Sequence, residues 1–255
     1  MNIKKHIPNA ITCGNLLCGC LAITYAFGGS LDKAAYLVGI AAILDFFDGF
    51  AARLLKVGGE MGKQLDSLAD MVTFGVVPGM MMFHMMYFSM RKIVNHTSSG
   101  MAYNILSEYW LLLAFLITIF SALRLAKFNI DTRQTDSFIG VPTPANTILI
   151  CSIPLINKFQ PTILGFDITA ITVNFYFLVG LTILMSYLLV AELPLFALKF
   201  KNFGWLDNKI RYSFLIISVV LLILFQFVAI PFIIFLYILL SIINNMMNKS
   251  KISKH

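Results

Sequence analysis

Long apolar stretches separated by short polar intervals run along the whole chain. A helix that crosses a membrane needs about 20 consecutive, mostly apolar residues. Eight segments approach or reach that length: 10–28, 34–56, 65–89, 108–128, 143–157, 168–191, 212–229 and 231–247. The pattern predicts an all-α fold, a polytopic membrane helical bundle with about eight transmembrane helices. We expect one membrane-embedded domain over residues 1–255, with a core at about 8–191 and accessory C-terminal helices at about 212–247.

The composition agrees with a membrane protein. Hydrophobic residues make up 59% of the 255 residues, and charged residues only 12%. A soluble globular protein carries roughly 25% charged residues. The mean hydropathy is +0.85, and the polar intervals are too short to form a soluble domain.

The distribution of Lys and Arg supports eight spans. With the N-terminus inside, 15 of these 19 residues lie at inside ends and 4 at outside ends. Merging the last two segments at Pro231 changes the division to 12 against 7. Because Lys and Arg concentrate on the cytoplasmic side of membrane proteins, the pattern predicts cytoplasmic N- and C-termini. Topology and anionic lipid headgroups therefore account for the net charge of +7, which does not indicate nucleic-acid binding.

Four carboxylates interrupt the apolar pattern at the inner ends of the second and third segments. Asp45 and Asp48 are three residues apart, and Asp66 and Asp70 are four apart. Side chains at these spacings share one face of a helix, so the two pairs can face each other across a tight turn at 58–62. An acid at bilayer depth costs about 2.5–3.5 kcal/mol. We therefore expect a bound cation to neutralise the cluster.

Carboxylates without Cys or His suit the hard cations Mg²⁺, Mn²⁺ or Ca²⁺. Four acids can hold two such ions, an arrangement that clamps a phosphoryl group during displacement. Gly49 leaves space for a ligand next to Asp48, and Arg53 offers planar donors to a phosphate. These residues favour phosphate transfer on a membrane-embedded substrate. The alternative from another class is a cation transporter with an intramembrane acid cluster.

The full motif is Asp45-x2-Asp48-Gly49-x2-Ala-Arg53-x8-Gly-x3-Asp66-x3-Asp70. It resembles the signature of the CDP-alcohol phosphatidyltransferase family at every position. The resemblance implies a Mg²⁺- or Mn²⁺-dependent transfer of a phosphatidyl group from CDP-diacylglycerol to an alcohol, with release of CMP. It also implies that Asp45 and Asp66 contact both ions, that Asp48 and Asp70 each contact one, and that Asp70 is the general base.

The same resemblance implies residues for the nucleotide lipid. Gly49 and Arg53 would hold the CDP group, and the segment 8–12 resembles the part of the family whose Asn and Thr approach the nucleotide, here Asn9 and Thr12. Gly59 stands where relatives often carry a Ser or Thr contact. A single in-line displacement would invert the configuration at phosphorus. A route through a covalent phosphatidyl-enzyme would need a nucleophile, and Ser67 is the one hydroxyl inside the motif.

Three later stretches, 74–78, 121–129 and 138–146, resemble the membrane-embedded class of bacterial and archaeal phosphatidylserine synthases. This resemblance implies L-serine as the acceptor, a homodimer, and an inner (cell) membrane location with the active site on the cytoplasmic side. A serine carboxylate needs a cation near the acids, and Arg124, Lys127 and Arg133 supply positive charge at that level of the membrane. The candidate acceptor contacts are Arg124 and Asn129. Charge alone leaves glycerol 3-phosphate and inositol phosphate open as acceptors.

Overall fold

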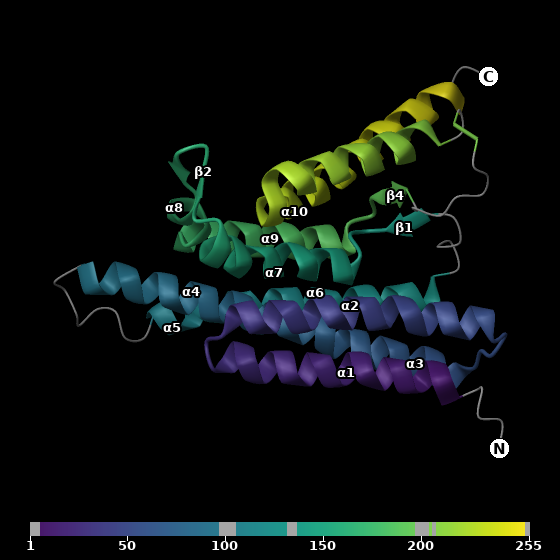
Figure 1. Ribbon diagram of the computed structural model, residues 1–255, viewed down its shortest axis with the longest axis horizontal. Coiled ribbons are helices and arrows are strands. Elements are labelled where there is room, and N and C mark those ends of the chain that lie inside the picture. Colours follow the sequence, from purple (N-terminus) through teal and green to yellow (C-terminus); the bar gives the residue numbers. More distant parts are fainter. Residues whose placement is uncertain (1–5, 97–105, 132–136, 197–203, 206–207, 253–255) are drawn as a thin grey trace.

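The computed structural model is a bundle of long helices with roughly aligned axes (Figure 1). It describes residues 6–96, 106–131, 137–196, 204–205 and 208–252. The helical elements are α1 (His6–Phe27), α2 (Leu31–Leu54), α3 (Glu60–Asp70), the π-helical turn η2 (Met71–Val76), α4 (Val77–His96), α5 (Leu106–Leu111), the 3-10 turn η3 (Leu112–Phe115), α6 (Leu116–Ile130), α7 (Thr143–Phe159), α8 (Thr169–Thr172), α9 (Phe175–Val190) and α10 (Lys209–Ile252). The prediction of an all-α polytopic bundle is confirmed.

Helices α1 and α2 form a tight antiparallel hairpin. Small residues on both helices are fully buried, among them Ala22, Ala26 and Ala34. Small side chains let two helix backbones approach closely, which is the usual packing between helices in a membrane. Gly29, with a φ of +76°, makes the turn between them in the left-handed conformation that glycine tolerates. The hairpin brings the start of α1 beside the end of α2.

Helices α3 and α4 form one long helix that contains the π-helical turn η2. This helix was predicted as a single span over 65–89, and it begins five residues earlier, at Glu60. Two hydroxyls from neighbouring helices donate to carbonyls of η2: Thr118 on α6 donates to Gly75 over 3.0 Å, and Thr147 on α7 donates to Phe74 over 2.9 Å. The wide turn is therefore held from two sides.

The C-terminal helix α10 is a hairpin of two arms. The chain leaves helical geometry at Gln226, where φ is 46° and ψ is −119°. The predicted break between 229 and 231 is wrong by a few residues. Gln160, at the end of α7, explains the position, because its side-chain oxygen accepts hydrogen bonds from the N–H groups of Phe227 and Val228. Those donors begin the second arm, and Pro231 lies inside this arm, five residues after the break.

The predicted sixth span also differs in its start. It was expected at 168–191, whereas α9 begins at Phe175. The preceding Asn174 caps the helix, because its side chain accepts hydrogen bonds from the N–H groups of Tyr176 and Phe177.

Among the residues that the structure describes, five stretches of helix are long and apolar enough to cross a membrane: 6–27, 31–54, 60–92, 109–130 and 209–246. Each of the eight predicted segments overlaps a helix, but α7 and α9 have only 17 and 16 residues. The number of eight crossings, and the division into a core and accessory helices, stay predictions. The start of α1 and the end of α10 lie at the same end of the bundle (Figure 1). Lys4 and Lys5, which the predicted orientation uses, lie outside the described residues.

Two short antiparallel sheets join the helices. Strand β1 (Ser137–Ile139) pairs with β4 (Pro194–Phe196), and β2 (Thr162–Ile163) pairs with β3 (Phe166–Asp167). The β1–β4 pair lies at the end of the bundle where α1 begins and α2 ends (Figure 1). It connects the entry into α7 with the exit from α9.

Candidate functional site

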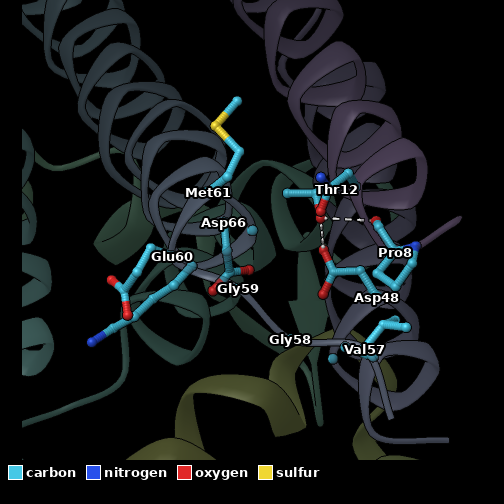
Figure 2. A pocket seen from close by; sticks show the side chains of 14 residues that line it. Pro8, Thr12, Asp48, Val57, Gly58, Gly59, Glu60, Met61 and Asp66 are labelled. Carbon is cyan, nitrogen blue, oxygen red and sulfur yellow. Dashed lines mark hydrogen bonds between the residues drawn. The ribbon is translucent and has the colours of Figure 1, made fainter. Parts of the chain in front are cut away.

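Three of the four predicted aspartates form a compact group. Asp45 and Asp48 on α2, and Asp66 on α3, each offer a carboxylate oxygen, and these oxygens lie within 4.8 Å of one another. The α2 pair shares a face because its members are three residues apart. Figure 2 shows Asp48 and Asp66 approaching the same space from the two helices. The predicted meeting of the two helices is present in the structure.

Asp70 stands one turn beyond Asp66 and outside this three-residue group. Its carboxyl adjoins that of Asp45 and accepts a hydrogen bond of 3.4 Å from the side chain of Asn15 on α1. Asn15 is fully buried, and its backbone carbonyl accepts a hydrogen bond from Thr73 in η2. The structure therefore brings α1 into contact with the end of α3 at the candidate base.

A cavity of about 400 Å³ opens beside Asp48 and Asp66. Four of the predicted nucleotide contacts line it: Asn9, Thr12, Gly49 and Gly59. The Thr12 hydroxyl lies 2.6 Å from a carboxylate oxygen of Asp48 and 3.0 Å from the carbonyl of Pro8 (Figure 2). This hydroxyl thus orients an aspartate of the group as well as lining the cavity.

Glycines shape this cavity. A Cβ atom at Gly62 would lie 3.2 Å from the side-chain oxygen of Asn9, so the absence of a side chain lets α3 approach α1. A Cβ at Gly49 would lie 3.6 Å from the guanidinium of Arg53. Arg53 therefore lies alongside the glycine rather than on the cavity wall itself.

The two predicted acceptor residues do not lie together. Arg124 lines a second pocket of about 310 Å³ with Lys127 and Glu192. Asn129 instead donates a 2.8 Å hydrogen bond to Ser67 on α3. Ser67 in turn donates to the carbonyl of Lys63 in its own helix.

The three-carboxylate group fits a divalent cation. None of its members forms an ion pair with Lys or Arg in the described part of the chain. Oxygen ligands bind Mg²⁺ at about 2.0–2.1 Å and Ca²⁺ at about 2.3–2.6 Å. Doubling these distances gives a widest separation between two ligand oxygens of about 4.2 Å for Mg²⁺ and about 5.2 Å for Ca²⁺. The 4.8 Å that contains this group therefore fits Ca²⁺ as it stands and Mg²⁺ after a small approach of the side chains. Asp70, next to Asp45, could complete the shell of a second ion.

Sequence reasoning missed several residues at this end of the bundle. Asn15 follows the predicted nucleotide segment by one helical turn, and its spacing from Thr12 could have revealed it. Gly140 and Glu192 are two others, and the β1–β4 pairing brings their segments together: the N–H of Gly140 donates to the carbonyl of Leu193 over 3.0 Å. No local pattern indicates that contact.

Comparison with known proteins agrees with this geometry. The model of the CDP-alcohol phosphatidyltransferase family matches residues 5–177. The CDP-diacylglycerol–serine O-phosphatidyltransferase of Bacillus subtilis (strain 168) is 35% identical over 161 residues, 63% of this chain and 81% of that protein. The enzyme of the same name from Helicobacter pylori (strain J99) is 36% identical over 156 residues, and the match spans only 59% of its length.

An archaeal relative matches a similar share of the chain. The archaetidylserine synthase of Methanothermobacter thermautotrophicus is 28% identical over 181 residues, 68% of this chain and 70% of that protein. The family match includes all four aspartates, both helices that carry them, and the α1 residues that line the cavity. The chain therefore belongs to the CDP-alcohol phosphatidyltransferase family.

Proposed function

We propose that this protein transfers the phosphatidyl group of CDP-diacylglycerol to the hydroxyl of L-serine, giving phosphatidylserine and CMP. The observation that carries the proposal is the three-carboxylate group, two members of which, Asp48 and Asp66, line the 400 Å³ cavity, in a chain of this family. The bacterial relatives whose names specify serine as the acceptor support the choice of alcohol.

Asp45, Asp48 and Asp66, with Asp70 beside them, would hold Mg²⁺ or Mn²⁺. When bound, the ions supply positive charge against the pyrophosphate and the departing CMP. Oxygen ligands alone also accept Ca²⁺. Thr12 keeps the Asp48 carboxylate in one orientation through their 2.6 Å hydrogen bond.

The cavity lined by Asn9, Thr12, Gly49 and Gly59 would take the CDP group. Its lining offers amide and hydroxyl groups, and exposed backbone at the glycines, where a nucleotide can approach closely. Arg53, beside Gly49, is within reach of a phosphate at the edge of the cavity.

Asp70 is the proposed general base. In the transfer, the serine hydroxyl oxygen forms a bond to the phosphatidyl phosphorus, and the bond from that phosphorus to the CMP oxygen breaks. The hydroxyl proton moves to the Asp70 carboxylate, and CMP leaves with the electron pair of the broken bond. Asn15, hydrogen-bonded to Asp70 over 3.4 Å, orients this carboxylate.

The membrane location, oligomeric state and orientation of the enzyme follow from the same proposal. We place the chain in the inner (cell) membrane as a homodimer, with both termini and the site on the cytoplasmic side. The start of α1, the end of α2 and the end of α10 lie at one end of the bundle (Figure 1), and α2 and α3 carry the acids. This arrangement supports the same side for the termini and the site. It is also the side on which CDP-diacylglycerol would meet soluble serine.

The test measures CMP release by the detergent-purified protein with CDP-diacylglycerol and Mn²⁺ or Mg²⁺. The acceptor is L-serine, glycerol 3-phosphate, inositol phosphate or none. We expect release only with serine, loss of release in Asp70→Asn, and normal release in Asp32→Asn, the same substitution at the far end of α2. Release with a different acceptor would overturn the assignment of serine. A folded protein that releases no CMP under any condition would overturn the assignment as a phosphatidyltransferase.

A further inference from the structure

The pocket of about 310 Å³ around Arg124 carries charges of both signs. Arg124 and Lys127 come from the last turns of α6, Asp131 follows that helix, and Glu192 follows α9. Arg124 lies close enough to Asp70 to interact with it electrostatically. Arg124 thus connects the pocket electrostatically to the proposed base, and the pocket shares no lining residue with the nucleotide cavity.

Arg124 is a buried cation with an unpaired hydrogen-bond donor, as expected of a residue that binds an anionic ligand. Its relative exposure is only 6%, yet its Nε atom has no hydrogen-bond partner in the described part of the chain. Its guanidinium lies 6.0 Å from the ring centre of Phe128. A buried charged group with an unpaired hydrogen-bond donor destabilises the protein. An anionic ligand in the pocket would remove that cost.

Glu192 is the acid best placed to complete such a site. Its backbone lies between the end of α9 and strand β4, and the pairing of β1 with β4 holds both. Gly140, at a φ of +77°, makes this possible, because a Cβ there would clash with the carbonyl oxygen of Leu189. Asp131 already has another interaction, whereas the Glu192 carboxylate has none with the described residues.

We propose that Glu192 binds the ammonium group of the acceptor while Arg124 binds its carboxylate. This inference rests on the proposed function and adds how the site would select an amino acid. A zwitterion matches an arginine and a glutamate facing one pocket, and each pair is a charge-assisted hydrogen bond. An acceptor that carries a phosphate and no ammonium would instead meet repulsion from Glu192, so the same residue favours serine and opposes glycerol 3-phosphate.

The test compares four acceptors in the CMP-release assay with the full-length protein: L-serine, 3-hydroxypropionate (serine without its ammonium), ethanolamine (serine without its carboxylate) and glycerol 3-phosphate. The affinity of each is measured as KM where turnover occurs and otherwise as an inhibition constant against serine. The variants are Glu192→Gln, Glu192→Asp and, as a matched loss of one exposed negative charge at the far end of the bundle, Asp167→Asn.

For Glu192→Gln we expect the KM for serine to rise about tenfold, with kcat within about twofold and the affinity for 3-hydroxypropionate unchanged. The preference for serine over 3-hydroxypropionate thus falls about tenfold. Glu192→Asp keeps most of the preference, and Asp167→Asn keeps all of it. These ratios would not move if Glu192 had only a structural role.

Three results would overturn the inference. In the first, Glu192→Gln lowers the affinity for serine and the affinity for 3-hydroxypropionate equally, or lowers neither. In the second, Glu192→Asp is as impaired as Glu192→Gln, which would exclude charge as the cause. Either result, with wild-type protein that uses serine, leaves the proposed function standing. In the third, wild-type protein releases no CMP with serine, so the proposed function fails and this inference fails with it.

Discussion

The π-helical turn η2 begins directly after Asp70, and the hydroxyl of Thr147 donates to its Phe74 carbonyl over 2.9 Å. A π-turn adds one residue to a helix, which rotates everything on one side of it by about 100° relative to the other. The turn thus sets the direction of Asp70 relative to the face with which α4 packs in the bundle. We predict that Thr147→Val impairs catalysis more than it impairs folding.

The magnitude follows from burial. Thr147 and Phe74 are both fully buried, so valine, which has nearly the same shape, leaves a carbonyl without its hydroxyl donor. Such a loss costs about 1–3 kcal/mol of folding free energy. Thr147 also lies 2.9 Å from the carbonyl of Thr143, and one hydroxyl proton serves both, which favours the lower half of that range. A displacement of about 1 Å at a catalytic group can cost about 10²-fold in rate.

The assay pairs CMP release with thermal unfolding of the same purified samples. Thr182→Val is the matched control, since this buried threonine donates only within its own helix, to the carbonyl of Leu178. Thr147→Ser keeps the hydroxyl and should keep the activity. If Thr147→Val loses no more activity than Thr182→Val does at a comparable loss of stability, then η2 does not position Asp70 and the reasoning is wrong.

Three further predictions test the fold around the site. Gly140→Ala should lower the free energy of unfolding by more than about 1–2 kcal/mol, because a positive φ alone costs that much for alanine; thermal unfolding measures the loss. Gln160→Leu should leave two N–H groups without their acceptor and speed hydrogen exchange at the start of the second arm of α10, with a cost of about 1–3 kcal/mol. Asp32→Asn removes a 2.5 Å ion pair with the half-exposed Lys158, so the free energy of unfolding should change by less than about 1 kcal/mol, with no change in CMP release.

The helices and the acidic group could be predicted from the sequence because both depend on short spacings. Apolar runs of about 20 residues specify helices in a membrane, where every backbone group must be paired internally. The spacing of Asp45 and Asp48 specifies one helix face regardless of what surrounds it. Asp66 then follows from the length of the turn that joins the two helices.

For Arg124 and Asn129, the spacing along the helix was not used, and the two residues were predicted to form one site. They were treated as one acceptor site because both end the fourth predicted span. Five residues of α-helix correspond to about 500°, so the two side chains point about 140° apart. One faces the mixed-charge pocket, and the other contacts Ser67 on α3. The angular spacing of an α-helix is therefore enough to separate these two residues.

Glu192 could not have been found in this way. It comes within reach of Arg124 because α9, which Glu192 follows, packs against α6, about 60 residues away in the sequence. The β1–β4 pairing fixes the segment after α9, and a pairing of three residues leaves no periodic signal. The acids of the transfer step all lie within 45–70, whereas the proposed acceptor contacts extend from 124 to 192. The reaction class is therefore encoded in a local pattern, whereas the proposed contact of Glu192 with the acceptor depends on tertiary packing. A change of acceptor within such a fold needs only the second set of residues to change, and the acceptor ratios of the Glu192 variants measure that separation directly.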